Sequence, residues 1–299
     1  MRFGIMAMQL GMLIPSDLAG RDVVDHVRRF SHAGLVRKLV GGGFHLIELG
    51  GDLAAFLPQT YSPGQIDELA VLKGDLGLTY TVHLPLWAVE PSTPLGPVRE
   101  GSVRALVDAV RATAPLVPEV YVLHATGALA SEFTRMALPP MGRALLLRQF
   151  QQAALHSLRA LLDETALPSR QLAIETVEFP LDLTLEMAEA LDLSICFDVG
   201  HVLSGFSGPL GVSEALQACA PRLAEVHLHD AVAPPSPDRL FYGRDHAPLG
   251  TGDLDIGAFL DQLTEVGFDG PVIFELKLPE AQASLAVVRS MRPALVSAP

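Results

Sequence analysis

The feature that most constrains the fold is a repeated unit, a short apolar or β-branched run followed by a helical pattern, which occurs eight times along the chain. Runs of this length are typical of buried parallel strands, and each parallel connection needs a crossover helix. The expected strands span residues 3–8, 44–49, 78–83, 119–124, 172–175, 193–198, 226–230 and 271–275. The expected helices span residues 23–39, 62–77, 98–114, 143–165, 181–191 and 256–266, with further helical segments around Cys219 and after the eighth strand.

Eight such units predict one closed (β/α)8 barrel of the TIM type, in a single domain over residues 1–299. A chain of 299 residues with 49% hydrophobic content can bury one large α/β core, and no composition shift marks a boundary between two domains. An open doubly wound sheet is the alternative. It fits less well because no Gly-rich phosphate-binding loop follows the first strand.

Charge narrows the class of partner. The chain carries 21 Lys and Arg against 34 Asp and Glu, for a formal net charge of −13, and its basic residues are scattered. Affinity for duplex nucleic acid comes largely from basic side chains that neutralise phosphates. A duplex partner is therefore disfavoured, and a small-molecule substrate is expected.

Cysteine usage and the start of the chain favour a cytoplasmic location. Cys196 and Cys219 are too few for a disulfide framework, so a reducing compartment is the simpler expectation. The apolar stretch from Met1 to Pro15 contains one Arg and no clear small-residue cleavage site, and it is interpreted as the first strand instead of a signal peptide. No apolar run reaches the roughly 20 residues that a membrane helix needs.

Ionisable side chains recur where the expected strands end. Because the carboxyl ends of barrel strands converge over one mouth, we expect these side chains to meet there. One such histidine alone is more often a core residue, but a crowd of buried imidazoles and carboxylates is costly unless a cation compensates. The residues at the ends of strands three to eight, with one on the loop after strand seven, are His83, His124, Glu175, Asp198 with His201, His227 with His229, Glu275, and His246.

The types of donor indicate the cation. Neutral imidazoles with carboxylates and no thiolate suit Zn, with Mn, Fe or Co as alternatives. One ion takes roughly four to six donors, whereas this mouth offers more, so two or three ions that share Glu175 as a bridging carboxylate are predicted. The predicted ligands are His83, His124, Glu175, Asp198, His201, His227, His246 and Glu275.

The pair Asp198 and His201 has two interpretations. Gly200 lets the chain turn, so that His201 folds back toward Asp198 as part of the site. Alternatively, Asp198 caps a helix and His201 lies on the surface.

Other polar and aromatic residues near the mouth have a functional and a structural interpretation that are about equally consistent with the sequence. Glu48, His229 and Asp230 either orient the ligands or serve the fold. Arg244 either binds a phosphate oxygen or is solvated, and Trp87 either stacks on a planar substrate group or caps the barrel core. The Pro-rich stretch that begins at Ala233 and ends at Asp238 is predicted to be an active-site loop.

Five segments carry a family resemblance: Leu-Ala-Ile-Glu175, Phe-Asp198-Val-Gly-His201, Val-His227-Leu-His-Asp230, Pro-Leu-Gly250-Thr-Gly252-Asp-Leu-Asp and Gly-Phe-Asp-Gly-Pro-Val-Ile-Phe-Glu275. Together they resemble the xylose-isomerase-like barrel superfamily, which includes sugar isomerases and epimerases and the endonuclease IV type (AP endonuclease family 2) of metal-dependent phosphodiesterase.

The resemblance implies two possible chemistries. The isomerase branch holds one divalent metal with a quartet to which Glu175, Asp198, His227 and Glu275 correspond. The hydrolytic branch adds zinc ligands where His83, His124, His201 and His246 fall. Where that branch has Asp-x-His, this chain has Arg244-Asp245-His246, so an aspartate ligand is either supplied by Asp245 in a shifted register or missing.

A narrower resemblance concerns the substrate. Thr-Tyr-Thr-Val-His83-Leu-Pro-Leu, Tyr-Val-Leu-His124, Glu-Phe-Pro-Leu-Asp182 and Ser-Ile-Cys-Phe-Asp198-Val-Gly-His201-Val-Leu are similar to segments of the cobamide-remodelling phosphodiesterases. The resemblance implies a metal-dependent hydrolase of a small-molecule phosphodiester, such as a cobamide nucleotide loop, with Glu175, Asp198, His201 and Glu275 in catalysis. A single-metal sugar or sugar-phosphate isomerase or epimerase is the alternative, and an abasic-site nuclease or a non-catalytic binding barrel is the less favoured possibility.

Overall fold

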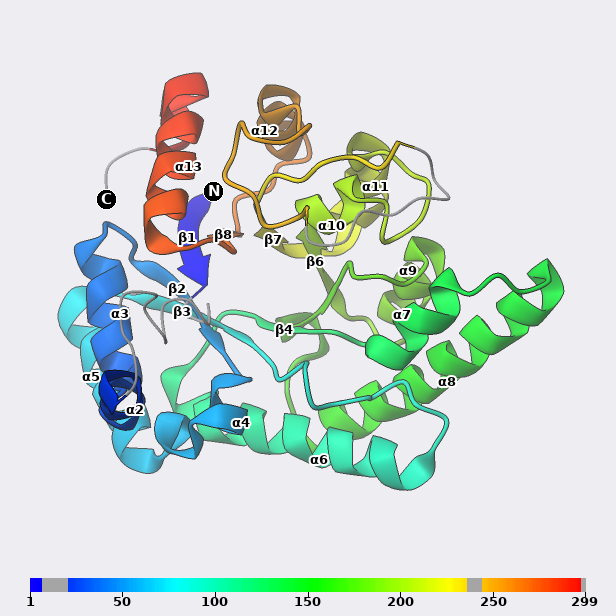
Figure 1. Cartoon of the computed structure of the whole chain (residues 1–299), viewed down its shortest axis with the longest axis horizontal. Coiled ribbons are helices and arrows are strands. Elements are labelled where there is room, and N and C mark those ends of the chain that lie inside the picture. The colour runs from blue at the N-terminus through cyan, green and yellow to red at the C-terminus, as the bar shows by residue number, and fades with distance from the viewer. Residues whose placement is uncertain (7–20, 236–243, 297–299) are drawn as a thin grey trace.

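Eight parallel strands close into a barrel in the order of the sequence, and β8 pairs with β1 (Figure 1). The computed structural model describes residues 1–6, 21–235 and 244–296. The strands are β1 Arg2–Met6, β2 Leu46–Gly50, β3 Thr79–His83, β4 Tyr121–Leu123, β5 Leu172–Glu175, β6 Ser194–Asp198, β7 Leu223–His227 and β8 Pro271–Phe274. The prediction of a (β/α)8 TIM barrel is confirmed.

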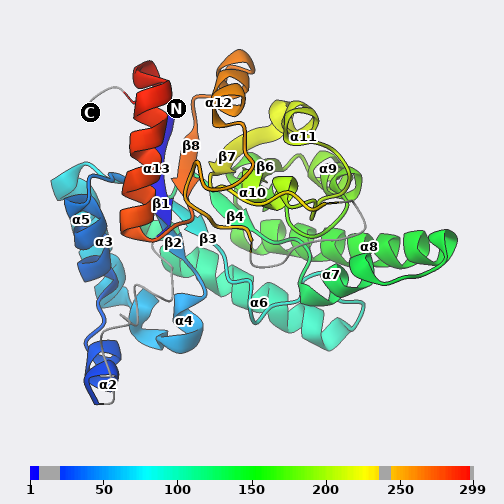
Figure 2. The same ribbon diagram turned by 45° about the horizontal axis from the view of Figure 1, so that its top comes forward.

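Helices surround the barrel, as the two ribbon views show (Figures 1 and 2). In the described residues they are α2 Arg21–Arg28, α3 His32–Gly41, α4 Leu53–Phe56, α5 Pro63–Leu76, α6 Gly96–Thr113, α7 Ala128–Arg135, α8 Pro140–Thr165, α9 Leu181–Ala190, α10 Val199–Leu203, α11 Val212–Cys219, α12 Ile256–Glu265 and α13 Leu278–Met291. Short 3-10 turns span Pro58–Tyr61, Ala114–Leu116, Ser169–Gln171, Ala220–Arg222 and Pro293–Leu295. None of the described helices is long and apolar enough to cross a membrane.

The prediction of one helix over residues 23–39 is wrong, because the chain forms α2 and α3 with a break between them. Ser31 has an extended backbone, and its hydroxyl accepts a hydrogen bond from the Gly34 N–H at 3.1 Å, so it caps the start of α3. The apolar pattern continues on both sides of Ser31, so the pattern alone does not reveal the break. The predicted positions 7 and 8 of the first strand lie outside the described residues.

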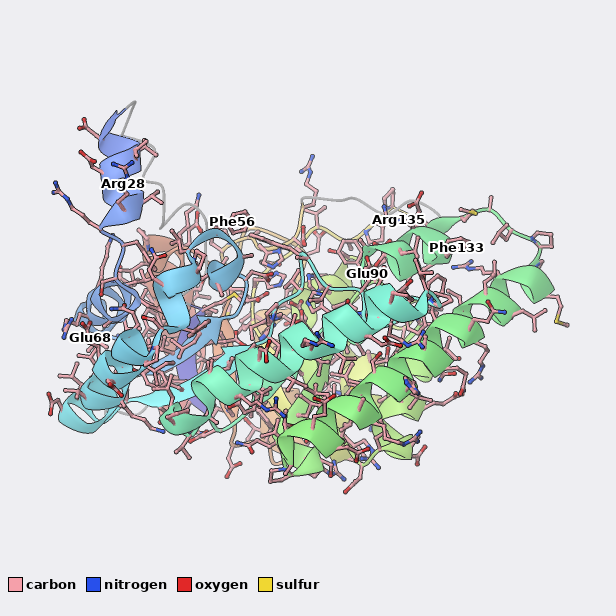
Figure 3. The ribbon with its side chains drawn as sticks, turned by 90° about the horizontal axis from the view of Figure 1, so that it is seen from below. Arg28, Phe56, Glu68, Glu90, Phe133 and Arg135 are labelled. Atoms are coloured by element: carbon pink, nitrogen blue, oxygen red, sulfur yellow. The ribbon has the colours of Figure 1, made fainter. Side chains whose placement is uncertain are left out.

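Two short helices, α4 and α7, lie in connections where no helix was expected. Each follows a strand, β2 and β4 respectively, and both lie on the side of the barrel where the strands end. Figure 3 shows Phe56 of α4 and Arg135 of α7 along this same edge. The mouth is therefore lined by more regular structure than the sequence pattern indicates.

The seventh strand ends at His227, not at Asp230 as predicted. Beyond it the Leu228 N–H still donates to the Ile273 carbonyl at 2.7 Å, and then Asp230 forms an antiparallel bridge with Ala247. The chain turns there because the buried Asp230 carboxylate accepts hydrogen bonds from four backbone N–H groups, those of Ala231, Gly250, Gly252 and Leu254, at 2.9 to 3.1 Å. Asp230 thus fixes the loop that follows His246.

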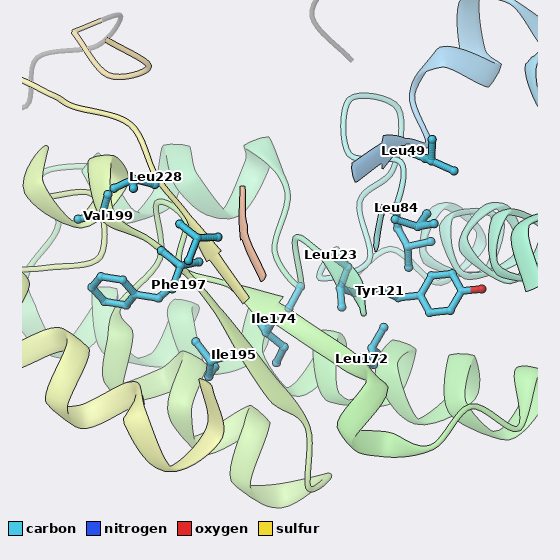
Figure 4. Close-up of a cluster of buried hydrophobic side chains, with 14 of the residues drawn as sticks. Leu49, Leu84, Tyr121, Leu123, Leu172, Ile174, Ile195, Phe197, Val199 and Leu228 are labelled. Carbon is cyan, nitrogen blue, oxygen red and sulfur yellow. The ribbon is translucent and has the colours of Figure 1, made fainter. Parts of the chain in front are cut away.

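Apolar side chains fill the layer between the strands and the helices. Ile174, Ile195 and Phe197 are among the buried side chains of this layer, and Figure 4 shows them beside the strands. Inside the lower barrel the space is narrow: a Cβ on Gly4 would lie 2.5 Å from the Leu46 carbonyl oxygen and 2.8 Å from Ile273. Cys196 and Cys219 are both buried and unpaired.

Candidate metal centre

Asp198 and His201, two of the predicted site residues, lie where β6 ends and α10 begins. Asp198 is the last residue of the strand and also the N-cap of α10, where its carboxylate accepts the His201 N–H at 2.7 Å. The capping interpretation therefore holds together with a place in the site. Gly200 serves close packing and not the sharp turn that was predicted for it, since a Cβ there would lie 2.1 Å from the His229 ring.

Glu175 at the end of β5 is the hub of a first group. One of its oxygens, Oε2, lies 2.9 Å from His83 Nε2 and 3.0 Å from His124 Nε2. The Nδ1–H of His83 donates to the Leu84 carbonyl at 2.9 Å, which leaves Nε2 as the nitrogen that faces the site. The atoms of these three residues are close enough together to hold one ion.

A second group lies beside the first and consists of four buried residues, Glu175, Asp198, His227 and Glu275. The Nδ1 of His227 lies 3.6 Å from Glu175, 3.8 Å from Asp198 and 3.5 Å from Glu275. No hydrogen bond satisfies either nitrogen of this fully buried ring. An unsatisfied imidazole that faces three carboxylates is the arrangement a divalent cation completes.

A third group contains Asp198, His201, His229 and His246. The rings of His229 and His246 stack with centroids 4.1 Å apart, and His201 Nδ1 lies 3.3 Å from both Glu175 and Asp198. His246 adopts a left-handed backbone with φ of 54°, which is costly for a residue with a side chain and concentrates at functional sites. Its Nε2 lies 3.1 Å from Glu275 Oε2.

His229 differs from the other histidines in this group because a backbone N–H donates to one of its ring nitrogens. The backbone N–H of His246 donates to His229 Nδ1 at 2.9 Å, so the ring carries its proton on Nε2, which lies 3.0 Å from Asp198. With Nδ1 accepting and the proton on Nε2, neither nitrogen of the neutral His229 ring has a lone pair free for an ion. The orienting role predicted for His229 would act through this contact with Asp198.

Asp245 lies at the third group despite its shifted position in the sequence. Its Oδ2 is 3.0 Å from His246 Nδ1 and 3.8 Å from His201 Nε2. The neighbouring Arg244 is exposed. Of the predicted loop that begins at Ala233, only residues 233–235 belong to the described part of the chain.

In the candidate metal centre, ionised carboxylates and protonated histidines stabilise one another's charged forms. Burial raises the pKa of Glu175, but the charges of His124 and His227 outweigh it and hold that pKa well below the usual value. Burial likewise opposes ionisation of His83 and His201, yet the carboxylates beside them, Glu175 for His83 and Asp198 with Glu175 for His201, raise both pKa values to about 9. The carboxylates are therefore matched by imidazolium groups when no ion is bound.

Sequence reasoning missed Glu225, which lies below the mouth on β7. This fully buried carboxylate accepts the Thr81 hydroxyl at 3.1 Å and lies 4.0 Å from His227 Nε2. Burial, followed by the charge of Glu48, raises the pKa of Glu225 well above its usual value. Glu225 precedes His227 by two residues, so strand alternation gives both the same face, but the predicted strand began after it.

Asp230 and Trp87 do not belong to the three groups. Asp230 is committed to its four backbone partners and serves the fold. Trp87 does not cap the barrel core: it is 49% exposed, and its ring packs edge-on against Phe56 with centroids 5.7 Å apart.

The sequence profile of the xylose isomerase-like TIM barrel family matches residues 36–292. The chain belongs to this family. Among curated proteins, an uncharacterized protein of Methanocaldococcus jannaschii is 25% identical over 218 residues, which cover 72% of this chain and 70% of that protein.

Two solved structures, of proteins whose names indicate different activities, share this fold. A D-tagatose 3-epimerase-like protein superposes with a TM-score of 0.69 at 18% identity, covering 99% of this chain and 98% of its own. Endonuclease IV from Thermus thermophilus superposes with a TM-score of 0.62 at 21% identity, covering 98% of this chain and 99% of its own. At these identities the likeness establishes the barrel and not the reaction.

The raised pKa values predict how pH acts on the metal-free protein. A histidine whose folded pKa is about 9 stabilises the fold fully below its unfolded pKa of about 6.5, and that stabilisation is lost as pH rises through 9. We expect the unfolding free energy of metal-free protein to fall by on the order of a few kcal/mol between pH 6.5 and 9.5 in urea titrations. Metal-loaded protein should not show this fall, and metal-free protein that gained stability over this range would contradict the assignment.

Proposed function

We propose that this protein is a metal-dependent hydrolase that cleaves a phosphodiester in a small-molecule substrate. The observation that carries the proposal is the placement of His83, His124, His201 and His246 around the quartet of Glu175, Asp198, His227 and Glu275. The quartet alone supplies four donors for one ion. The added histidines create two further groups, and these share Glu175 or Asp198 with it.

The donors fit two or three divalent ions, with zinc the best match to a set of imidazoles and carboxylates. Such ions, when bound, lower the pKa of water toward neutrality and stabilise negative charge on phosphoryl oxygens. Glu175 would join the first group to the second through its two oxygens, and Asp198 would join the second to the third. The chain's own residues hold these side chains close together at the mouth of the barrel, where most of them are buried.

The substrate class follows from charge and from the narrower sequence resemblance. A net charge of −13 leaves little basic surface for a duplex, so we propose a small phosphodiester, with the nucleotide loop of a cobamide as the first substrate to assay. Retention of a labelled abasic duplex at low salt would contradict this part of the proposal. Trp87, exposed on the loop after β3, is available to stack on a planar group of the substrate.

A single-metal sugar isomerase or epimerase is the alternative, and one observation favours it: the quartet forms a complete group by itself. In that case Glu175 and Glu275 would act as acid and base at a sugar carbon. Phosphodiester cleavage without epimerisation of ketohexoses favours the hydrolase, and the reverse result favours the alternative.

Removal of the shared carboxylates should abolish hydrolysis. In Glu175→Gln and Asp198→Asn each side chain keeps its size but loses the charge that two groups share, so kcat on bis(p-nitrophenyl) phosphate should fall by at least about 10²–10³. Circular dichroism should show intact folds. Glu189→Gln, on the exposed face of α9, is the control and should retain full activity. Full activity in either site variant would refute these residues as part of the site.

Glu48 is proposed to orient His227. Both side chains are fully buried, and Glu48 Oε2 faces His227 Nε2 at 3.3 Å, so the negative charge of Glu48 favours a proton on Nε2 and leaves Nδ1 for the ion. Glu48→Leu should weaken the affinity for one ion about 10- to 100-fold in chelator competition. The exposed Glu68→Gln on α5 should not change it (Figure 3). Equal affinities in both variants would leave Glu48 without this role.

A further inference from the structure

A large groove opens beside the metal centre, and neither the predicted ligands nor the proposed chemistry accounts for it. Its volume is 1340 Å³, and its walls come from residues 134–138, 143, 180–182, 202–203, 205–212 and 233–234. These segments follow β4, β5, β6 and β7, so the groove lies on the mouth side of the barrel. The end of α7 and the start of α9 both contribute to its lining.

The walls of the groove are mainly apolar. Met136 at the end of α7 and Leu210 before α11 are 38% and 43% exposed, and Leu203 and Pro180 are partly exposed between them. Apolar side chains left open to solvent in a concave surface are typical of a binding site. The charged residues of the lining are few and of both signs: Arg135, which pairs with Glu178 at 2.8 Å, and the exposed Arg143 and Asp182.

The groove adjoins the third metal group at His201. Val202 and Leu203 line it and follow His201 directly on α10. Phe206, also in the lining, places its ring 5.6 Å from the His201 ring. His201 therefore has Glu175 and Asp198 at its Nδ1 and a groove residue, Phe206, against its ring. The groove therefore lies close enough to the centre to be considered as the place of a substituent of the substrate.

The size and chemistry of the groove define what it takes. Pockets of roughly 300–1,000 Å³ suffice for drug-sized ligands, so this one exceeds the need of a simple sugar phosphate. We propose that one ester group of the phosphodiester substrate is a bulky, uncharged, ring-containing group, of nucleoside size or larger, and that it binds in this groove. The inference rests on the proposed hydrolytic function and names the substrate class for that site.

The test compares two esters that share a leaving group, methyl p-nitrophenyl phosphate and 2-naphthylmethyl p-nitrophenyl phosphate, on zinc-loaded protein. Wild-type KM should be about tenfold lower for the naphthylmethyl ester, because only its ring system buries apolar area in the groove. Met136→Asp and Leu210→Asp, on two different walls, should remove most of this difference while leaving kcat and the methyl ester nearly unchanged. Leu76→Asp, at a leucine of α5 that is 40% exposed outside the groove, is the matched control and should alter neither ester.

The possible failures are distinguishable. Hydrolysis of both esters with equal KM, or a difference that survives both groove variants, would overturn the groove assignment and leave the hydrolase intact. If wild-type protein cleaved neither ester, the hydrolytic function would be wrong and the substrate class with it.

Discussion

The contact on which the site depends is the sharing of the buried Glu175 carboxylate among histidines from four segments, His83, His124, His201 and His227. A lone carboxylate at this depth would be strongly disfavoured in its charged form, because burial opposes ionisation. The barrel brings the imidazoles to it from strand ends far apart in the sequence. The charge at the mouth is therefore compensated only when the barrel closes. A divalent ion can compensate the carboxylates in place of the imidazolium groups.

Some residues around Glu175 belong to the candidate metal groups, and others hold the surrounding loops in place. Asp198 does both, since it caps α10 and lies between two of the metal groups. Asp230, only one residue after His229, is used entirely by backbone N–H groups, most of them from the loop after His246. The left-handed backbone of His246 precedes the loop that Asp230 anchors, so a residue outside the three groups helps to position a candidate ligand.

The eight strands, and the ionisable residues at the ends of most of them, could be predicted from the sequence because residue type and parallel topology decide them together. The break at Ser31 could not, since one cap residue interrupts an apolar pattern that continues on both sides of it. Glu225 was missed because the predicted seventh strand began one residue after it. Gly200 was misinterpreted because the side chain that packs against it, His229, comes from another part of the chain. The groove forms where four connecting segments pack close together. No pattern within any one of these segments predicts that they meet.

The central claim is that the mouth holds a cluster of ions and not a single one. The most direct measurement is elemental analysis of metal per chain on protein purified without chelator, with His83→Ala beside it. The account predicts two or three zinc-like ions in the wild-type protein and a lower content in His83→Ala. A single ion per chain, unaffected by His83→Ala, would contradict the account and would favour sugar isomerisation or epimerisation.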